Sequence, residues 1–263
     1  MKPTSPRAAR RLAKKQNKSA ALTFADLANR VAKARARGVN KTSEERAKKV
    51  LNAYLQTAQG YGMPVNDVVS EMARGQTAWR LGHAVRDEIL KTPPDAVRKA
   101  DCKQGCAFCC ILTGGDGGLI TAFEAEQLHA ALEPLQNQPD GCEWHPSGCP
   151  ALDPATQECR AYEARPMICR SFLSTDSQAC EENAAGGETQ GAGLLGSHVD
   201  YLAVHALCRQ TLKGITQVHT YSMASIAAGA VMGTDSQTTL TQSRHGPSAL
   251  EQDCKDVGSA TGA

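Results

Sequence analysis

The stretch that most constrains this chain is CKQGCAFCC, residues 102–110, in which four of the nine residues are cysteines. Thiolates repel one another, so a group this dense needs either disulfide bonds or a cation to neutralise it. The C-x2-C spacing of Cys106 and Cys109 is typical of a tight metal-binding turn whose backbone amides can donate to bound sulfur. If residues 102–106 form one helical turn, Cys102 shares a face with Cys106, and three sulfurs can converge on one centre.

Two cysteines of this stretch, Cys109 and Cys110, are adjacent in the chain. Successive side chains diverge by about 100° on a helix and point to opposite faces of a strand. We therefore expect these two thiols to serve different metal atoms, or different irons of a cluster, and we expect more than one metal atom in the protein.

The cysteines continue beyond this stretch, and nine of the eleven lie between residues 101 and 182, in a segment punctuated by glycine and proline. Such punctuation predicts short, loop-rich structure. We interpret residues 100–182 as a small domain that is stapled by metal. The candidate metal ligands are Cys102, Cys106, Cys109, Cys110, Cys149, Cys159, Cys169 and Cys180.

Other cysteines carry a weaker signal. Cys142, His145 and Cys149 have the spacing C-x2-H-x3-C, which is either an auxiliary zinc site or an ordinary loop. Cys208, in an amphipathic segment, is predicted to be a small packing residue, and Cys254 is predicted to be a residue of the C-terminal tail.

The composition predicts a reducing compartment. The number of cysteines is odd, and the first twenty residues contain no apolar run that could serve as a secretory signal. No window approaches the roughly 18 apolar residues that a membrane span needs. We expect a cytoplasmic protein without a membrane partner, in which clustered thiols bind zinc or iron, and an iron–sulfur cluster is one form that the iron can take.

The cysteine stretch is the first part of a longer ordered pattern. It is followed by ITAFEAEQL at 120–128, CPALD at 149–153, ECRAY at 158–162 and RPMICR at 165–170. Taken in order, these segments resemble the YkgJ-type cysteine-cluster family of zinc- or iron-chelating proteins, over about residues 100–182. The resemblance implies a metal site formed by Cys106, Cys109, Cys110, Cys149, Cys159 and Cys169, and it does not indicate the metal or the biochemical role.

Two arginines stand within this pattern, at Arg165 and Arg170. Several thiolates around one metal leave net negative charge, which a fixed guanidinium can offset. The alternative is that they form ordinary surface pairs with Glu163 or Asp176. Residues 102–109 also match the C-x3-C-x2-C spacing of radical SAM enzymes, but we reject that family because the following residues lack its alternating strands and helices.

The rest of the chain is predicted to be mainly α, with helical flanks around the small, loop-rich, metal-stapled cysteine-cluster domain. Aromatic residues make up 4% of the sequence, so the core must consist mostly of Ala, Leu and Val, which favours helices. Capping boxes at Thr42–Glu45 and Thr121–Glu124 predict helix starts. Apolar spacing predicts helices at 22–37, 43–58, 65–91 with a break near Gly75, 198–213 and 215–232.

These patterns divide the chain into six segments. They are a basic, flexible arm (1–41), a helical region (42–99), the cysteine-cluster domain (100–182), a linker (183–197), C-terminal helices (198–232) and a disordered tail (233–263).

Charge is distributed unevenly along the chain. Residues 1–50 hold 15 Lys and Arg against 3 Asp and Glu, whereas the remainder holds 14 against 24. A basic arm on an acidic body can contact nucleic acid or a protein partner, or it can be a solvated extension. The leading hypothesis is a metal-binding protein. The alternatives are an iron–sulfur enzyme that modifies a protein substrate and a zinc-stapled adaptor that uses the basic arm, and the sequence shows no common catalytic motif that decides whether the protein is an enzyme.

Overall fold

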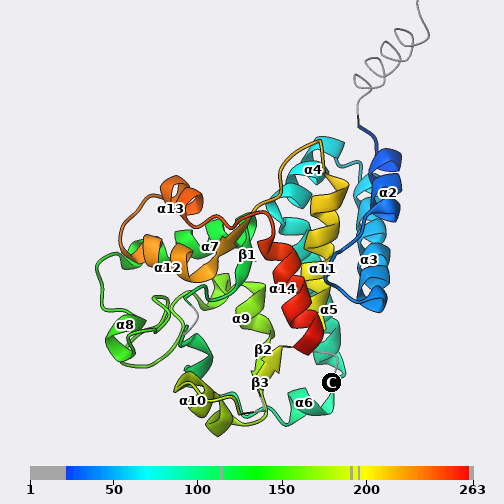
Figure 1. Ribbon diagram of the computed structural model, residues 1–263. Coiled ribbons are helices and arrows are strands. Elements are labelled where there is room, and N and C mark those ends of the chain that lie inside the picture. Colours follow the sequence, from blue (N-terminus) through cyan, green and yellow to red (C-terminus); the bar gives the residue numbers. More distant parts are fainter. Residues whose placement is uncertain (1–21, 113–114, 190–191, 195, 261–263) are drawn as a thin grey trace, which may run out of the picture.

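The protein is mainly α-helical, as predicted, in a computed structural model that describes residues 22–112, 115–189, 192–194 and 196–260 (Figure 1). The helices before the cysteine segment are α2 (Phe24–Lys33), α3 (Lys41–Gly60), α4 (Val65–Arg74), α5 (Gln76–Lys91) and α6 (Asp95–Arg98). The short elements that follow are η1 (Phe108–Cys110), β1 (Leu119–Thr121), α7 (Ala122–Leu132), η2 (Glu133–Leu135), α8 (Gly141–Trp144), η3 (Tyr162–Ala164), α9 (Met167–Ser171), β2 (Phe172–Ser174), α10 (Ser177–Ala184) and β3 (Ala192–Leu194). The last elements are α11 (Gly196–Thr211), β4 (Thr220–Ser222), α12 (Met223–Val231), α13 (Ser236–Gln242) and α14 (Ala249–Ala260).

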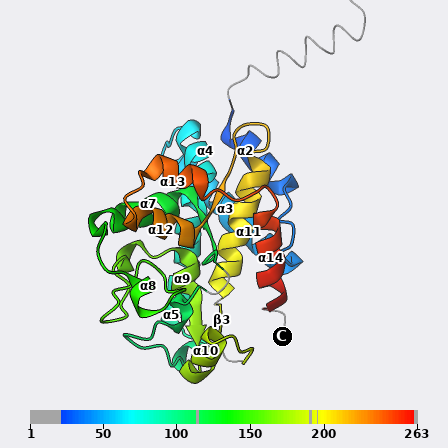
Figure 2. The same cartoon turned by 60° about the vertical axis from the view of Figure 1, so that its left-hand side comes forward.

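Helix α11 is the centre of the first half of the fold. It packs against α2, α3, α4, α5, α9 and α14, and both ribbon views show it beside α14 (Figures 1 and 2). Its side chains are buried around most of its circumference, with Tyr201, Leu202 and Leu207 at most 1% exposed. A helix that is covered on all sides is a core helix, so residues near the C-terminus organise the helices near the N-terminus.

The second half of the fold is built on α7 and α12, which pack against each other and against α13. Strands β1 and β4 pair antiparallel beside them, with Ile120 opposite Tyr221. The apolar cluster between these elements includes Leu128 and Ile226, and it also includes Cys149 and Leu152 of the cysteine segment. The cysteine loops therefore share a core with α7 and α12.

The predicted break near Gly75 is confirmed, and it lies where the two halves touch. Gly75 ends α4 and precedes α5 with a positive φ of 80°. A Cβ atom at this position would lie 2.3 Å from Cγ2 of Thr121, the N-cap residue of α7. Glycine is thus required both by the left-handed backbone conformation and by the close approach.

The start of α3 differs from the prediction. The expected capping box at Thr42–Glu45 is wrong, because the N-cap residue is Asn40, whose side chain accepts from the backbone N–H of Ser43. The helix begins one residue before Thr42, which leaves that hydroxyl inside the first turn. The second predicted capping box, Thr121–Glu124, is confirmed.

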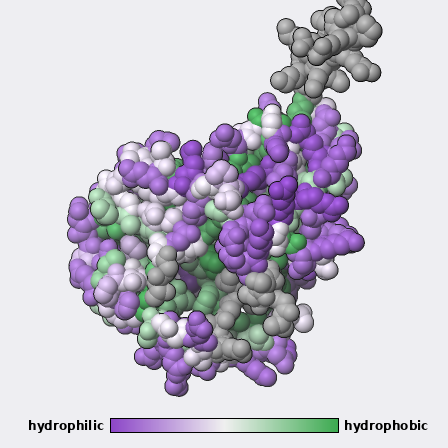
Figure 3. Space-filling view, in the orientation of Figure 1, coloured by the Kyte–Doolittle hydropathy of each residue, from purple (hydrophilic) through white to green (hydrophobic). Residues whose placement is uncertain are grey.

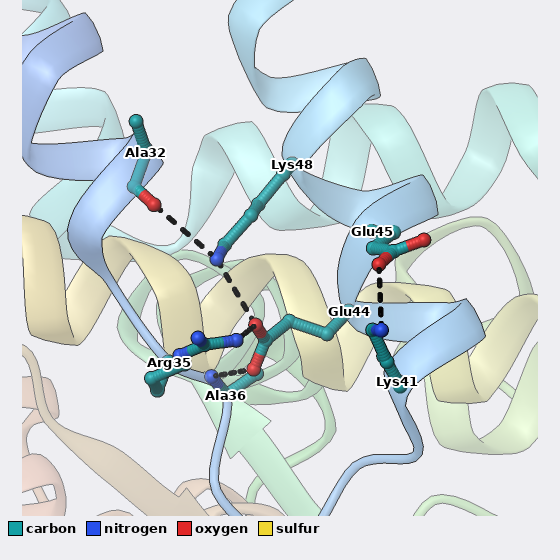
Figure 4. Close-up of polar contacts among 7 residues, drawn as sticks. All are labelled: Ala32, Arg35, Ala36, Lys41, Glu44, Glu45 and Lys48. Atoms are coloured by element: carbon teal, nitrogen blue, oxygen red, sulfur yellow. Dashed lines mark hydrogen bonds and ion pairs between the residues drawn. The ribbon is translucent and has the colours of Figure 1, made fainter.

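A buried carboxylate, Glu44, fixes the connection between α2 and α3 (Figure 4). It accepts from Arg35 Nη1 at 3.0 Å, from the backbone N–H of Ala36 at 2.9 Å and from Lys48 Nζ at 3.0 Å. Burial alone would raise the pKa of Glu44, but the hydrogen bonds from Lys48, Ala36 and Arg35 together hold it below its usual value. The chain between α2 and α3 is thereby anchored to α3.

The predicted flexible arm, residues 1–41, is wrong for the described part of that range. Leu27 and Val31 of α2 are 0% exposed, and Arg30 Nη1 donates to the backbone oxygen of Thr211 at 3.1 Å. The apolar stripe of α2 is narrow, yet it suffices because α3 and α11 cover it. Residues 1–21 lie outside the described residues.

The predicted disordered tail is also wrong as far as residue 260, because α13 and α14 occupy much of it. Leu250, Cys254 and Val257 are at most 9% exposed and follow a spacing of four and three residues, which places them on one helical face against α11. The polar residues that suggested disorder belong to the outer surface, which is mainly hydrophilic over α14 (Figure 3).

The predicted linker, residues 183–197, contains regular structure at both ends. Helix α10 extends to Ala184, β3 pairs antiparallel with β2, and α11 begins at Gly196. Residues 190, 191 and 195 lie outside the described residues. Across the described part of the chain, no helix combines the length and the apolar character that crossing a membrane demands.

Candidate metal centre

The stretch at 102–110 is a turn and not the expected helix. Gly105 has a positive φ of 78°, and helical structure begins only with the short 3-10 segment η1. The prediction that a helical turn aligns Cys102 with Cys106 is therefore wrong, because glycine in a left-handed conformation reverses the chain between the two cysteines.

Backbone pairing brings the end of this stretch to Cys149. The N–H of Cys149 donates to the carbonyl of Cys110 at 2.8 Å, and the N–H of Leu112 donates to Ser147 O at 2.7 Å. Behind this contact the chain is packed so closely that a Cβ atom on Gly141 would lie 2.2 Å from the Cys149 oxygen. The positions of Cys110 and Cys149 are thus fixed relative to each other by main-chain contacts.

A tight hairpin, residues 151–160, then brings Cys159 close to Cys110 and Cys149. The N–H of Asp153 donates to Glu158 O at 2.9 Å, and the N–H of Arg160 donates to Ala151 O at 2.8 Å. Leu152, at the start of this hairpin, is 1% exposed in the core beneath it. The hairpin is therefore held against α7 and α12 while Cys159 lies at its closing end.

Cys169 is supplied by α9, and the buried Glu124 holds that helix in place. Glu124 Oε1 accepts from the backbone N–H of Met167, in the first turn of α9, at 2.8 Å. Glu124 Oε2 accepts from the Thr121 hydroxyl at 2.8 Å and from the Tyr201 hydroxyl at 2.5 Å. One carboxylate thus joins α7, α9 and α11, a role that the sequence did not reveal because a capping box already accounts for a Glu at this position.

These segments enclose a pocket of about 70 Å³ between α7, α9 and the cysteine loops. Its apolar lining is formed by Leu112, Gly117, Leu128, Ala151, Leu152, Pro166, Ile168, Phe172 and Met223. Its remaining lining is Arg165 and five thiols, those of Cys109, Cys110, Cys149, Cys159 and Cys169. Five of the eight candidate ligands, from four separate segments, therefore face one small pocket.

Cys109 and Cys110 do not diverge as expected. Both line this pocket, and their sulfurs are 4.0 Å apart. Two sulfurs bound to one tetrahedral zinc at about 2.3 Å lie about 3.8 Å apart. The expectation that the two thiols serve different metal atoms is thus not supported, because the irregular backbone of η1 lets both side chains turn to the same side.

The protonation of these thiols follows from burial and from one hydrogen bond. A hydrogen bond from Cys110, aided by the charge of Arg165, outweighs burial and lowers the pKa of Cys109 to about 7. The same hydrogen bond, together with burial, raises the pKa of Cys110. Burial raises the pKa of Cys149 and of Cys169 to about 12. The pocket therefore holds one easily ionised thiol among protonated ones.

The backbone is arranged to support thiolates. Burial raises the pKa of Cys149 and of Cys159, and backbone hydrogen bonding from Ala151 and Ala161, each two residues further along the chain, lowers it in part. Such N–H to sulfur bonds stabilise negative charge on metal-bound sulfur. The donor set and its hydrogen bonds thus fit a thiophilic metal.

The two arginines have different tasks. Arg165 is the cation at the pocket, where the charges of Cys169, Cys159, Cys110 and Cys109 raise its pKa against the effect of burial. Arg170 donates instead to the backbone oxygens of Tyr162, Glu163 and Arg165. Arg165 lines the pocket beside the thiols, while Arg170 holds the η3 turn and its charge, like that of Arg165, lowers the pKa of Cys159 against the larger effect of burial.

Residues 101–188 match one family model, CxxCxxCC, whose description reads "Putative zinc- or iron-chelating domain". The segment is a CxxCxxCC domain. This confirms the resemblance found in the sequence and covers about a third of the chain. No curated protein and no solved structure matches the chain.

Three candidate ligands of the CxxCxxCC domain, Cys102, Cys106 and Cys180, lie outside this pocket. Cys180 belongs to α10 and is buried, whereas Cys102 is exposed and its sulfur accepts the N–H of Ser174 at 3.3 Å. Within the described residues, no three cysteine, histidine or carboxylate side chains are already close enough to hold one ion together. Metal binding in the pocket therefore requires its thiols to move closer together.

The remaining cysteines of the chain have other contacts. The Cys142 thiol donates to the backbone oxygen of Gly148 at 3.4 Å, and His145 Nδ1 accepts the N–H of Ser147 at 3.1 Å. Neither lines the pocket of the CxxCxxCC domain. Cys208 and Cys254 are buried in the helical half, at 0% and 2% exposure. Cys208 is the packing residue that was predicted, and Cys254 is also a packing residue instead of a tail residue.

Proposed function

We propose that this protein binds a zinc or iron centre in the pocket formed by Cys109, Cys110, Cys149, Cys159 and Cys169. The observation that carries the proposal is the convergence of these five thiols, from four segments, on one small pocket. The match of residues 101–188 to a zinc- or iron-chelating domain supports it. The role of each individual cysteine as a ligand is part of this proposal.

Charge balance favours a metal in this pocket over a redox disulfide. All eleven cysteines, which lie within the described residues, are free thiols. Four thiolates around a divalent cation carry a net charge of about −2, and Arg165 offsets part of it at the pocket wall. The backbone N–H groups that donate to Cys149 and Cys159 offset more.

An iron–sulfur cluster is the alternative occupant. It is supported by the all-cysteine donor set and by the apolar lining of the pocket. The further alternatives, an enzyme that modifies a protein and an adaptor that uses the basic arm, gain no support from the described residues. Most of the basic arm, residues 1–21, lies outside them.

The test is metal analysis of protein that is purified without oxygen, with an absorption spectrum to separate zinc from iron–sulfur. We expect stoichiometric zinc or iron in the wild-type protein and its loss in Cys169→Ser. The matched control is Cys208→Ser, which changes a cysteine buried in the helical half and should retain the metal. Full metal content in Cys169→Ser, or reduced wild-type protein that takes up neither metal, would overturn the proposal.

A further inference from the structure

One wall of the pocket that the five thiols line is a short loop, residues 115–118, which directly precedes β1. Gly117 of this loop lines the pocket. A Cβ atom on Gly117 would lie 2.7 Å from Cε of Met223, and a Cβ atom on Gly118 would lie 2.9 Å from Cγ1 of Ile168. Met223 and Ile168 are themselves pocket-lining residues. The backbone of the loop therefore lies directly on the lining and closes this side of the pocket.

The other walls of the pocket are held by main-chain pairing and by a buried carboxylate. The N–H of Cys149 donates to Cys110 O at 2.8 Å, and Glu124 accepts the N–H of Met167 at 2.8 Å. In the loop, by contrast, three of the four residues are glycines, so Asp116 carries the only side chain that can hold it. The loop is the wall whose position depends on a single side chain.

Asp116 joins the loop to two other segments. Its backbone oxygen accepts from the N–H of Ala224 at 3.0 Å and from the hydroxyl of Ser222 at 3.1 Å, which connects the loop to the start of α12. Its Oδ1 atom lies 3.1 Å from Nε2 of His245. An ionised carboxylate can only accept, so the ring N–H of the histidine donates. The side chain of Asp116 thus connects the loop to the C-terminal part of the chain.

His245 is in turn held in place by its own backbone. Its N–H donates to Thr220 O, in β4, at 2.9 Å. The His245 side chain is 16% exposed and that of Asp116 is 51% exposed, so solvent reaches the pair from one side. Asp253 of α14 faces the same pair: burial raises its pKa to about 6, aided by the charges of Asp116 and Asp256, and the charge of His245 opposes the rise. The pair therefore lies where the loop, β4 and α14 meet.

We propose that the hydrogen bond between Asp116 and His245 is a latch, which keeps the loop closed over the thiol pocket, and that the metal ion enters and leaves when this bond breaks and the loop opens. The inference rests on the proposed function, because it assumes that the pocket holds the ion. A single hydrogen bond at a partly exposed position changes an equilibrium about fivefold. Such a contact slows the exchange of an ion without preventing it.

A different route to the pocket leads past Cys109. This residue is exposed, and it lines both the thiol pocket and an open cavity of about 270 Å³ between η1 and α10. Asp116 is not among the residues that line either cavity. Replacing Asp116 or His245 should therefore leave this route unchanged, and variants of the pair separate the two routes.

The first test measures access to the pocket in the full chain, reduced and freed of metal. The initial rate at which iodoacetamide alkylates Cys149, which lines the pocket and is 6% exposed, is measured by mass spectrometry. Asp116→Ala and His245→Leu, which remove the hydrogen bond, should raise this rate about fivefold. Asp116→Asn and His245→Gln, which keep an acceptor and a donor at these positions, should be alkylated at nearly the wild-type rate.

Cys208 is the control within each molecule. It is 0% exposed in the helical half, so it reacts only when the whole protein opens. Its rate should stay the same in Asp116→Ala and His245→Leu. The matched control variant is Asp26→Ala, which removes an exposed capping carboxylate of α2 and should leave the ratio of the two rates unchanged. An unchanged rate at Cys149, or an equal rise at Cys149 and Cys208, would overturn the proposal.

The second test measures the ion itself. The zinc-loaded wild-type protein and its variants are mixed with a coloured chelator in the absence of oxygen. Asp116→Ala and His245→Leu should release zinc about fivefold faster with unchanged stoichiometry, and equal release rates would refute the latch. A wild-type protein that takes up neither zinc nor iron would refute the proposed function, while the alkylation rates would still decide whether the loop is latched. Asp116 is 51% exposed, so Asp116→Ala keeps both tests valid if His245→Leu fails to fold.

Discussion

Two histidines of α11 should make the protein sensitive to mild acid. His198 and His205 are both 0% exposed. Burial lowers the pKa of His198 from 6.5 to about 4, and burial together with the charge of Arg209 lowers that of His205 to about 3. Neither ring nitrogen of His198 has a hydrogen-bond partner in the described part of the chain, so nothing in its surroundings favours the charged ring.

The sign and size of the effect follow from the difference in pKa between the folded and unfolded states. Above pH 6.5 both rings are neutral in both states and stability does not depend on them. Between pH 6.5 and about 4 the unfolded chain binds protons that the folded chain refuses, so stability falls as the pH falls. At 1.36 kcal/mol per pH unit, each histidine lowers the free energy of unfolding at pH 5 by about 2 kcal/mol, and the pair lowers it by about 4 kcal/mol.

The assay is equilibrium unfolding in urea at pH 7 and pH 5, followed by far-ultraviolet circular dichroism. Wild type is compared with His198→Phe, His205→Leu and the double variant, which cannot titrate at these positions. Metal release in acid is common to all four proteins and cancels in the comparison. We expect each single variant to recover about half of the extra acid sensitivity of wild type. Identical pH dependence in wild type and the double variant would refute the reasoning.

Four further predictions follow from buried contacts. Glu124→Gln should lower the free energy of unfolding by about 1–3 kcal/mol, because an amide cannot accept every hydrogen bond that this carboxylate accepts. The variant should also bind metal more weakly, because Glu124 holds Met167 and α9 in place; unchanged affinity in a metal titration of the folded variant would contradict this. Metal uptake should release protons, and the affinity for metal should rise with pH, because most pocket thiols are protonated at pH 7 and Cys109, with a pKa of about 7, is only partly ionised. Calorimetry in buffers of different ionisation enthalpy measures the released protons, and metal binding without proton release would contradict the site. Glu44→Ala should lower the free energy of unfolding by about 1–3 kcal/mol, because buried donors are left unpaired. An unchanged midpoint of urea unfolding would mean that Glu44 does not anchor the connection between α2 and α3. Cys254→Ser should lower the free energy of unfolding by about 1–3 kcal/mol and should retain the metal. A variant as stable as wild type would show that α14 does not pack as described.

The helices were predictable where one side chain pattern decides the structure. The spacing of Val68 and Met72, with Gly75 after them, predicts a helix and its end, and α4 and α5 have this form. The Thr121–Glu124 capping box likewise predicts the start of α7. Both signals lie within a few residues of the structure that they indicate, so no distant contact is needed to interpret them.

The ends of the chain were mispredicted because their burial depends on a distant partner. The stripes at Leu27 and Val31, and at Leu250 and Cys254, are too narrow to indicate a buried helix in isolation. Both become core because α11, which is buried around most of its circumference, packs against α2 and against α14. A helix with a narrow apolar stripe is stable only when another element covers that stripe. For α2 the covering helix, α11, lies more than a hundred residues further along the chain.

From the sequence alone one can predict a mainly α protein and a thiol-rich segment that resembles zinc- or iron-chelating domains, because composition and the order of the cysteines are local properties of the chain. Which thiols meet depends on contacts that form only when the chain folds. Cys109, Cys110, Cys149, Cys159 and Cys169 line one pocket, whereas Cys102, Cys106 and Cys180 are not among its lining residues. The physical reason is that backbone pairing between Cys110 and Cys149, and the Glu124 hydrogen bond to α9, are contacts between residues far apart in sequence, and no spacing rule along the chain encodes them.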